Sequence, residues 1–382
     1  MSALAGRITT FSVNPFKLGF FGANCSSGLA CTKVTERWSG SWEDNLSLAQ
    51  MADDAGIDFL LPVGRWKGYG GETNFEGTTL ETTAWACGLL AKTQRITVFA
   101  TVHSPLVHPV LAAKQFVTAD HLSRGRFALN IVCGWNQGEF DMFGIEQREH
   151  DMRYEHGAEW LRAVHRLWSE PGSFEIENDF FSLKHVEAEP KPYGNTRPIV
   201  MNAGSSTAGR AFGARYCDVL FRSCKTIETG AVDVRETQAE AQSFGREIGV
   251  YTTAYVICRP TKREAEEYER YVSDENGDWG AIDHHLAVSR ANNHTLRGMS
   301  DDEFAIHRRR HAVGSGGYPL VGDPEHIARE LGQIAAAGFG GIALSFVNYL
   351  DEFPYFRNEV MPRLERMGLR NSGSHRDVAV AS

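Results

Sequence analysis

The amino-acid sequence predicts an α/β fold of the (β/α)8 TIM-barrel class. Short apolar runs alternate about eight times with amphipathic stretches along the 382 residues, and such alternation predicts a parallel sheet with helices outside it. Eight units in one chain favour closure into a barrel over a doubly wound sheet. No Gly-x-Gly-x-x-Gly motif opens a helix after a strand, so a dinucleotide-binding sheet has little support. We expect one domain over residues 1–370 and a disordered tail over residues 371–382.

The order of the elements follows from the spacing of the apolar residues. Short apolar runs bounded by turn residues predict strands, and apolar residues three and four positions apart predict helices. The expected strands are residues 17–21, 57–61, 96–101, 126–132, 198–202, 219–221, 251–258 and 342–346. The expected helices are residues 42–55, 80–92, 110–123, 152–168, 208–216, 229–248, 324–337 and 349–367.

Two stretches are too long for simple turns and are expected to be insertions. Residues 171–192 hold two short apolar runs on either side of a polar turn, which predicts a small hairpin. Residues 273–317 are polar and irregular, with short helical stretches expected around 281–291 and 301–311. They follow the seventh strand, on the barrel face where active sites lie. A mobile lid is one interpretation of this second insertion. A solvated excursion or an oligomer contact is equally consistent with the sequence. Three successive arginines within it would add positive charge near a bound anion.

Composition and charge argue against several classes of function. The formal net charge of −9 argues against nucleic acid or an anionic membrane as the main partner. The seven cysteines form no Cys-x-x-Cys pair, and an odd number of this kind is typical of reduced thiols in a cytoplasmic protein. No apolar run is long enough to span a bilayer, and the first residues do not resemble a signal peptide. We therefore expect a cytoplasmic protein.

One loop has the chemistry of a phosphate site. The strand at 198–202 is followed by Gly204, Ser205 and Ser206, which open the next helix. Free backbone N–H groups and the helix dipole favour an anion there, and Gly204 lets it approach closely. Ordinary capping of the helix by one of the serines is the alternative. The late position in the barrel favours phosphate, because such loops commonly hold it.

Polar residues also end two central strands. Asn130 and Thr101 fall where strand side chains should otherwise be apolar. A buried amide needs partners, and the pyrimidine edge of a flavin would supply them; a structural amide and an ordinary strand threonine are the alternatives. His307 and His311 have a spacing seen in metal sites, but three arginines lie between them and oppose a divalent cation. We therefore expect no metal site.

In their order along the chain, these motifs resemble the bacterial luciferase-like flavin monooxygenases. TVFATVHSPLVHP at 97–109, DHLSRGR at 120–126 and NIVCGW at 130–135 are similar to that family, and GSS follows at 204–206. The resemblance covers roughly residues 17–367. NIVCGW and KGYGG at 67–71 are most similar to the pyrimidine and dimethylsulfone monooxygenase branch.

The resemblance implies a set of site residues. Thr101 and Asn130 would position oxygen beside the flavin. The residues matched to the flavin ring are Thr101, Asn130 and Glu139, and those matched to the phosphate are Tyr154, Gly204, Ser205 and Ser206. Val63 and Arg65 fall where the pyrimidine enzymes have methionine and lysine near the flavin. That difference argues against pyrimidine as the substrate.

The resemblance also implies the activity. A two-component monooxygenase would use FMN, reduced by a separate NAD(P)H:flavin reductase, and O2 to oxygenate a small heteroatom-containing substrate. That substrate would be an organosulfur compound or a cyclic amide, with or without cleavage of a C–S or C–N bond. A homodimer or homotetramer is implied. Two alternatives remain open: a deazaflavin-dependent oxidoreductase of the same fold, and a non-catalytic flavin-binding barrel.

Overall fold

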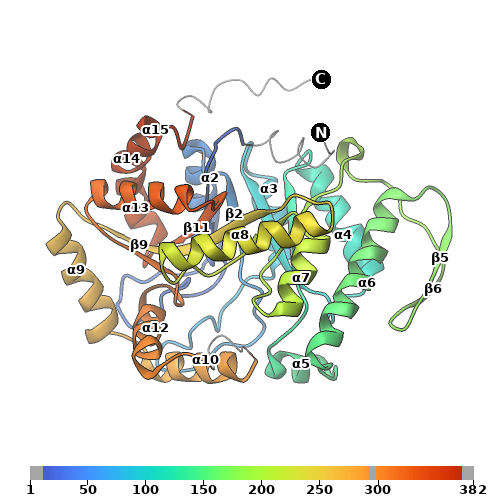
Figure 1. Ribbon diagram of the computed structural model, residues 1–382, viewed down its shortest axis with the longest axis horizontal. Coiled ribbons are helices and arrows are strands. Elements are labelled where there is room, and N and C mark those ends of the chain that lie inside the picture. The colour runs from blue at the N-terminus through green and yellow to red at the C-terminus, as the bar shows by residue number, and fades with distance from the viewer. Residues whose placement is uncertain (1–11, 293–297, 372–382) are drawn as a thin grey trace.

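A closed ring of parallel strands forms the centre of the molecule, as the computed structural model shows for residues 12–292 and 298–371 (Figure 1). Each strand pairs with the next along the chain, and the ring closes because β9 pairs with β8 and β11, and β11 pairs with β1. The TIM-barrel prediction is confirmed. The ring consists of β1 (Lys17–Phe21), β2 (Phe59–Leu61), β3 (Thr97–His103), β4 (Phe127–Val132), β7 (Ile199–Asn202), β8 (Val219–Phe221), β9 (Gly249–Cys258) and β11 (Gly341–Ser345).

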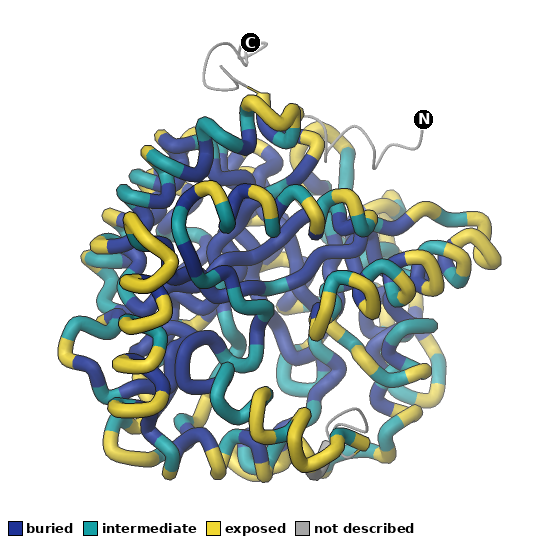
Figure 2. The backbone as a smooth tube through the Cα atoms, turned by 60° about the vertical axis from the view of Figure 1, so that its left-hand side comes forward, coloured by how far each residue is buried: buried dark blue, intermediate teal, exposed yellow. Residues whose placement is uncertain are grey.

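Helices cover the outside of the ring, and Figure 2 shows the buried strands enclosed by helices with exposed outer faces. Capping residues set the helix ends: Ser41 accepts from the Asp44 N–H at the start of α2, and Gly56 ends it with φ 72°. The helices are α2 (Trp42–Ala55), α3 (Thr82–Leu90), α4 (Pro109–Leu122), α5 (Gln137–Phe143), α6 (His150–Ser169), α7 (Thr207–Tyr216), α8 (Ile227–Ser243), α9 (Lys262–Arg270), α10 (Trp279–Asn292), α12 (Asp301–Gly314), α13 (Pro324–Ala336), α14 (Tyr349–Glu359) and α15 (Met361–Arg366).

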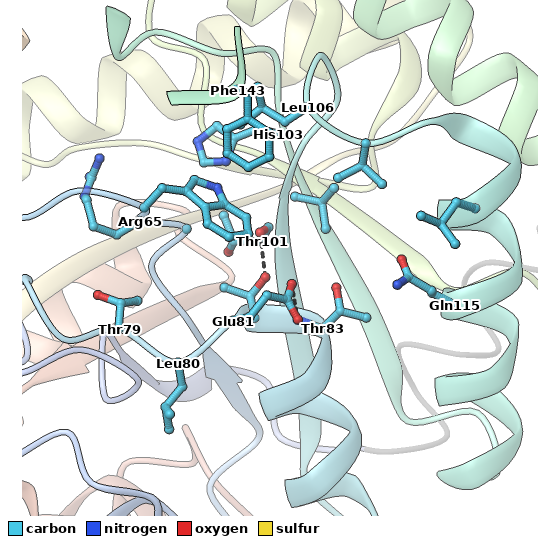
Figure 3. A pocket seen from close by; sticks show the side chains of 16 residues that line it. Arg65, Thr79, Leu80, Glu81, Thr83, Thr101, His103, Leu106, Gln115 and Phe143 are labelled. Carbon is cyan, nitrogen blue, oxygen red and sulfur yellow. Dashed lines mark hydrogen bonds between the residues drawn. The ribbon is translucent and has the colours of Figure 1, made fainter. Parts of the chain in front are cut away.

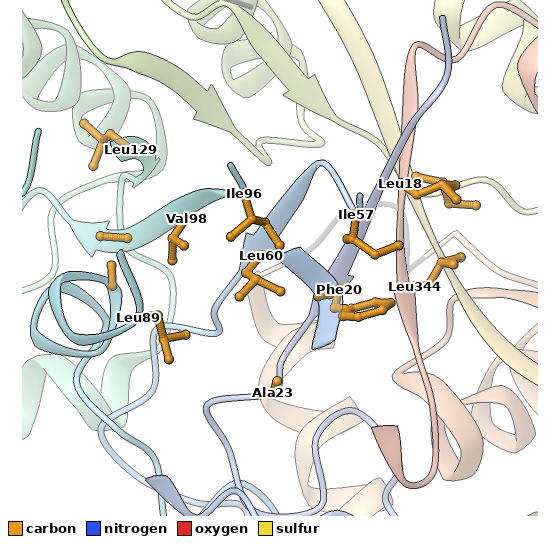
Figure 4. Packing of buried hydrophobic residues seen from close by; sticks show 14 of the residues in the cluster. Leu18, Phe20, Ala23, Ile57, Leu60, Leu89, Ile96, Val98, Leu129 and Leu344 are labelled. Carbon is orange, nitrogen blue, oxygen red and sulfur yellow. The ribbon is translucent and has the colours of Figure 1, made fainter. Parts of the chain in front are cut away.

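Apolar side chains fill both faces of the ring. Because strand side chains alternate, one set points into the barrel and the other packs under the helices. Leu18, Leu60 and Val98 belong to the outer set (Figure 4). Inside the barrel, a Cβ on Gly19 would lie 2.3 Å from the Phe59 ring, so a glycine is needed there. The inner set contains Phe59, Leu61, Phe99, Ala128, Met201, Val219, Tyr251 and Ala343.

Several elements differ from the sequence prediction. The helix expected over 229–248 ends at Ser243, because Gly245 adopts a left-handed conformation with φ 69°. The helix expected over 349–367 is two helices that meet at Val360, where a proline in the first turn of α15 supports a new start. Helices α5 and α9 and strand β10 (Tyr318–Gly322) were not predicted. Ala265 is the one buried residue of α9, and the helix is otherwise charged apart from Tyr268, so it offers few apolar residues from which to predict a helix.

The two insertions have different structures. Residues 171–192 contain an antiparallel hairpin of β5 (Phe174–Glu177) and β6 (Ser182–Val186), which projects from the right of the barrel in Figure 1. Within residues 273–317, α10 and α12 are regular helices, and they coincide with the two short helical stretches expected at 281–291 and 301–311. Buried residues of both helices form a second core with residues such as Tyr69 and Phe75. This packing places the insertion over the loop that follows β2.

The three arginines of α12 are largely occupied. Arg308 pairs with Asp283 at 2.6 Å, and Arg309 pairs with Asp274 at 2.8 Å. The expectation that these arginines supply free positive charge is therefore weakened. The tail expected over 371–382 lies outside the described residues except for Asn371. Among the described helices, none has the length and apolar character needed to cross a bilayer.

Candidate active site

The carboxyl ends of β3 and β4 bring two predicted site residues into contact. Thr101 and Asn130 are register partners, and they are only 7% and 6% exposed. Asn130 Nδ2 donates to Thr101 Oγ1 at 3.2 Å, and the Thr101 hydroxyl donates to the Pro62 carbonyl at 2.6 Å. Asn130 Oδ1 is buried and has no hydrogen-bond partner among the described residues. A buried acceptor in this state is costly, and a ligand N–H would satisfy it.

A buried ion cluster lies beside this pair, and it joins two residues of the loop after β2 to one residue of α5. Arg65 donates to Glu76 at 2.9 Å and to Glu139 at 2.8 Å, and all three side chains are at most 6% exposed. Glu139 also accepts the Trp66 backbone N–H at 3.0 Å. The Arg65 guanidinium stacks over Tyr69, with its carbon 4.8 Å from the ring centroid. Two of the predicted site residues, Arg65 and Glu139, are therefore held together by direct ionic hydrogen bonds.

Burial sets the protonation of this cluster. Burial raises the pKa of Glu76, although the Arg65 charge opposes the shift. Burial would lower the pKa of Arg65, but Tyr69 and the two carboxylates outweigh it and raise that pKa. His103 follows Thr101 by two residues on β3, and its Nε2 lies 3.8 Å from Glu139 Oε2. Burial lowers the pKa of His103 to about 4 despite this carboxylate, so the imidazole is neutral near pH 7.

A second group of predicted residues meets at the start of α7. Ser206 caps this helix by accepting the Gly209 N–H at 3.1 Å. The Tyr154 hydroxyl, from α6, hydrogen-bonds the Ser206 side chain, while burial raises its pKa. A Cβ on Gly204 would lie 2.7 Å from the Gly209 Cα, so only glycine fits this approach. Ser205 is exposed beside them. The first amides of α7 have no partners within the helix and can receive an anion.

Val63, another predicted residue, is held by a side chain that the sequence did not single out for this task. Its backbone N–H donates to Asn24 Oδ1 at 2.8 Å, and its carbonyl accepts from Asn24 Nδ2 at 2.9 Å. Asn24 is fully buried and comes from the loop after β1. This amide therefore fixes the backbone between β2 and Arg65, much as a neighbouring strand would.

The two groups suit the two ends of a flavin mononucleotide. A flavin ring offers N–H groups along its pyrimidine edge, which match the unpartnered Asn130 Oδ1. A phosphate matches the first turn of α7 with Ser205, Ser206 and Tyr154 around it. The site residues predicted from sequence thus divide into a ring-side group at β2–β4 and a phosphate-side group at β7–α7.

A pocket of about 330 Å³ opens sideways from the ring-side group, between the starts of α3 and α4. We call it the lateral pocket. Figure 3 shows Phe143, Leu106 and His103 at one end of it and Thr79, Leu80 and Glu81 at the other, with Thr101 between. A second hollow of about 220 Å³ lies under α10, where His284 and Val288 face Lys67 and Tyr69.

Sequence reasoning missed three residues of the ring-side group. His103 could have been found, because it lies on the same face of β3 as Thr101 two residues earlier. Glu76 lies in a loop without periodicity, and Asn24 acts through the backbone of a residue 39 positions away. Neither leaves a signal in a single sequence. Within the described part of the chain, no group of three or more His, Cys, Asp or Glu side chains could hold a metal ion.

Two enzymes are similar to this chain over most of its length. A 30% identical relative, the FMNH(2)-dependent dimethylsulfone monooxygenase of Pseudomonas fluorescens (strain Pf0-1), aligns over 92% of this chain and 95% of its own length. The pyrimidine monooxygenase RutA of Escherichia coli (strain K12) is 28% identical, over 91% of each chain.

Solved structures show the same fold. DmoA from Hyphomicrobium sulfonivorans superimposes with a TM-score of 0.83 at 19% identity, covering 95% of this chain and 90% of that one. A family profile described as luciferase-like monooxygenase matches residues 20–340 of this chain. With the barrel and the arrangement of polar residues at its mouth, this match shows that the chain belongs to the luciferase-like monooxygenase family.

Proposed function

We propose that the protein is a two-component monooxygenase that uses reduced FMN and O2 to oxygenate a small heteroatom-containing substrate of the organosulfur or cyclic amide type. Reduced FMN supplies two electrons, one oxygen atom enters the substrate, and the other leaves as water. The relatives named FMNH2-dependent support the cofactor, and the family membership supports the reaction class.

The observation that carries the proposal is the Thr101–Asn130 pair. A threonine hydroxyl fixed by the Pro62 carbonyl holds the amide, and the amide oxygen is left without a partner at the barrel mouth. Such an arrangement is preorganised for a planar ligand with N–H groups. In this proposal the pair orients the flavin edge and the oxygen beside it.

The remaining residues of the proposed site have separate tasks. Arg65, Glu76 and Glu139 hold the wall beside the ring rigid, since the Arg65 guanidinium is hydrogen-bonded to both carboxylates. Tyr154, Gly204, Ser205 and Ser206 would hold the phosphate at the start of α7. Low exposure of the ring-side group keeps water away from the reacting atoms, which a reactive oxygen chemistry requires.

Two partners complete the proposal. The reduced flavin needs a source, for which we propose a separate NAD(P)H:flavin reductase. We also propose that the chain forms a homodimer or homotetramer in the cytoplasm. Light scattering on the purified protein measures the oligomeric state, and a monomer at micromolar concentration would contradict that part.

The insertion over residues 273–317 is proposed to act as a lid that becomes better ordered when flavin and substrate bind. Asp278 accepts from the Thr73 N–H and hydroxyl at 2.7 and 2.8 Å, so the insertion is tied to the loop after β2. Hydrogen exchange of α10 and α12 with and without FMN tests this. Equal protection in both states would contradict a flavin-coupled lid and favour an oligomer contact.

Oxygen consumption and product mass spectrometry test the function itself. The assay supplies chemically reduced FMN and a panel of sulfones, sulfonates and cyclic amides. We expect one substrate to gain an oxygen atom from ¹⁸O2. Hydride transfer with a reduced deazaflavin, and none of this oxygenation, would favour the deazaflavin alternative. Flavin binding without turnover of any compound would favour a non-catalytic barrel.

The flavin is proposed to be FMN rather than FAD. The motivation is a single phosphate-binding helix start in the proposed site, with no second nucleotide-binding unit predicted from the sequence. Equal turnover with reduced FMN and reduced FAD at equal concentration would contradict this choice.

A further inference from the structure

The lateral pocket has walls suited to a small molecule rather than to a stretch of protein. Its volume of about 330 Å³ is at the small end of ligand pockets. One side is apolar, with Leu106 and Phe143, and Phe143 stacks edge-on against Trp66 at 5.0 Å. The inner end reaches Thr101 and His103, so a bound molecule would lie next to the ring-side group.

Gly64 lies between the lateral pocket and the side chains of Thr101 and His103. A Cβ on this residue would lie 3.0 Å from Thr101 Cγ2 and 2.9 Å from His103 Cε1. The absence of a side chain therefore keeps the corner between the pocket and Thr101 clear. A larger residue would have to displace one of these two buried side chains.

Among the described residues, no positively charged side chain that lines the pocket is free to pair with an anionic ligand. Arg65 is already bound to the carboxylates of Glu76 and Glu139. His103 is buried, and its pKa is lowered to about 4, so it is neutral near pH 7. Glu81 is the remaining ionisable residue of the wall, and its carboxylate is negative.

The helix starts that face the pocket are closed to anions as well. Glu81 caps α3, accepting the Thr83 N–H at 3.0 Å and the Ala84 N–H at 2.7 Å. His108 caps α4 through its Nδ1, and Pro109 has no N–H to give. These helix starts thus differ from α7, whose first amides are proposed to hold the flavin phosphate.

Donors for a neutral acceptor are present. Thr83, which is 7% exposed, and Gln115 both line the pocket, and a threonine hydroxyl and a glutamine amide can each donate a hydrogen bond. A sulfonyl or carbonyl oxygen could accept from either group, while the alkyl part of the ligand would contact Leu106 and Phe143.

We propose that the lateral pocket binds the substrate, and that this substrate is an uncharged molecule with an apolar body and one or two acceptor oxygens, such as a dialkyl sulfone or an amide. Sulfonates and carboxylates are disfavoured there, because they would meet Glu81 and no free cation. This assignment rests on the proposed monooxygenase function, and it selects one substrate class within it.

Calorimetric titration of the full chain without flavin tests binding separately from turnover. The probes are diethyl sulfone and propane-1-sulfonate, which have the same number of non-hydrogen atoms and differ in charge. We expect the sulfone to bind at least about tenfold more tightly, which corresponds to about 1.4 kcal/mol. Equal affinities, or no binding of the sulfone, would overturn the proposal.

Two tryptophan variants on one helix locate the binding site. Leu111 and Leu122 both belong to α4 and are both 54% exposed, but only Leu111 lines the pocket. Leu111→Trp should weaken sulfone binding and raise the KM about tenfold or more, whereas Leu122→Trp should leave both unchanged. Equal effects of the two substitutions would show that the sulfone binds elsewhere.

Glu81→Gln tests the charge argument, since glutamine keeps an oxygen that can cap α3. Removing one unit charge near the ligand should improve propane-1-sulfonate binding about fivefold, while sulfone binding stays the same. An unchanged preference would overturn the role of Glu81. The proposed function fails on a different result, namely no oxygenation of any compound by the wild-type enzyme with reduced FMN.

Discussion

The ring-side and phosphate-side groups satisfy their polar atoms in opposite ways. On the ring side, Glu76 and Glu139 are buried and both bind Arg65, so these three side chains have their partners within the protein. At α7, Ser205 is exposed and the first helix amides have no partners within the helix. The difference is that the buried charges of the ring side are paired within the protein, whereas the start of α7 is open to solvent. Removing a charge from the buried cluster should therefore lower mainly the stability of the fold, and a change at the start of α7 should lower mainly ligand affinity.

The largest effect is expected from Arg65→Ala. This change leaves two buried carboxylates without their cation, so the free energy of unfolding should fall by about 3–5 kcal/mol. Arg210→Ala is the matched control on α7, where Arg210 pairs with Glu236 at 2.9 Å but lies partly in solvent; about 1 kcal/mol or less is expected there. Denaturant titration measures both. Similar losses would remove the contrast between the two sides.

Low pH should also lower the stability of the fold through the ring-side group. His103 has a pKa of about 4 in the fold against 6.5 ordinarily, so the unfolded chain binds the proton more readily between these values. The stabilisation that neutral His103 contributes to the fold is therefore fully present above about pH 6.5. It is lost as the pH falls toward 4, and the free energy of unfolding decreases by at most about 3 kcal/mol.

His103→Gln should remove this part of the acid sensitivity, and the exposed His185→Gln should not. Unfolding free energies from denaturant titrations at pH 7 and pH 4.5 provide the measurement. If the two substitutions change the pH dependence alike, His103 is not the residue responsible.

The substitutions Thr101→Val and Asn130→Ala test the role of the ring-side group in the reaction itself. Each removes a preorganised polar contact beside the proposed flavin edge, and the loss in oxygenation rate should be on the order of 10²-fold. Thr97→Val is the control, because Thr97 lies on the same strand and is similarly buried. The measurements are product formed per reduced FMN and FMN affinity. Normal product yield in both variants would contradict the assigned role.

The smallest effect is expected at α7. Ser206→Ala should cost about 1 kcal/mol of stability through the lost cap and weaken FMN binding about tenfold. Ser300→Ala removes an equivalent cap from α12 and should affect stability alone. Riboflavin, which has no phosphate, should bind wild type and Ser206→Ala equally. A matching loss of riboflavin affinity would mean that Ser206 does not act on the phosphate.

The spacing of apolar residues along the sequence was enough to predict most strands and helices of the barrel. The boundaries of β1, α2 and β8 could be predicted because their apolar spacing ends at clear turn or capping residues, as Gly56 shows at the end of α2. Helix α9 was not predicted because its sequence contains few apolar residues, and only Ala265 is buried. The two helical stretches of the insertion over 273–317 were expected, but their common core was not, because it forms only when residues such as Tyr69 and Phe75 pack against them.

The sequence by itself determined the fold class, a helix start at Ser205 or Ser206, and the positions of Thr101 and Asn130 at strand ends. Only the tertiary structure decided that these two side chains bond each other, that Arg65 is shared by Glu76 and Glu139, and that Asn24 holds Val63. The physical reason is that strand and helix periodicity acts over a few residues, whereas these contacts join residues between 11 and 74 positions apart. Charge compensation of this kind depends on burial, and burial exists only after the ring has closed.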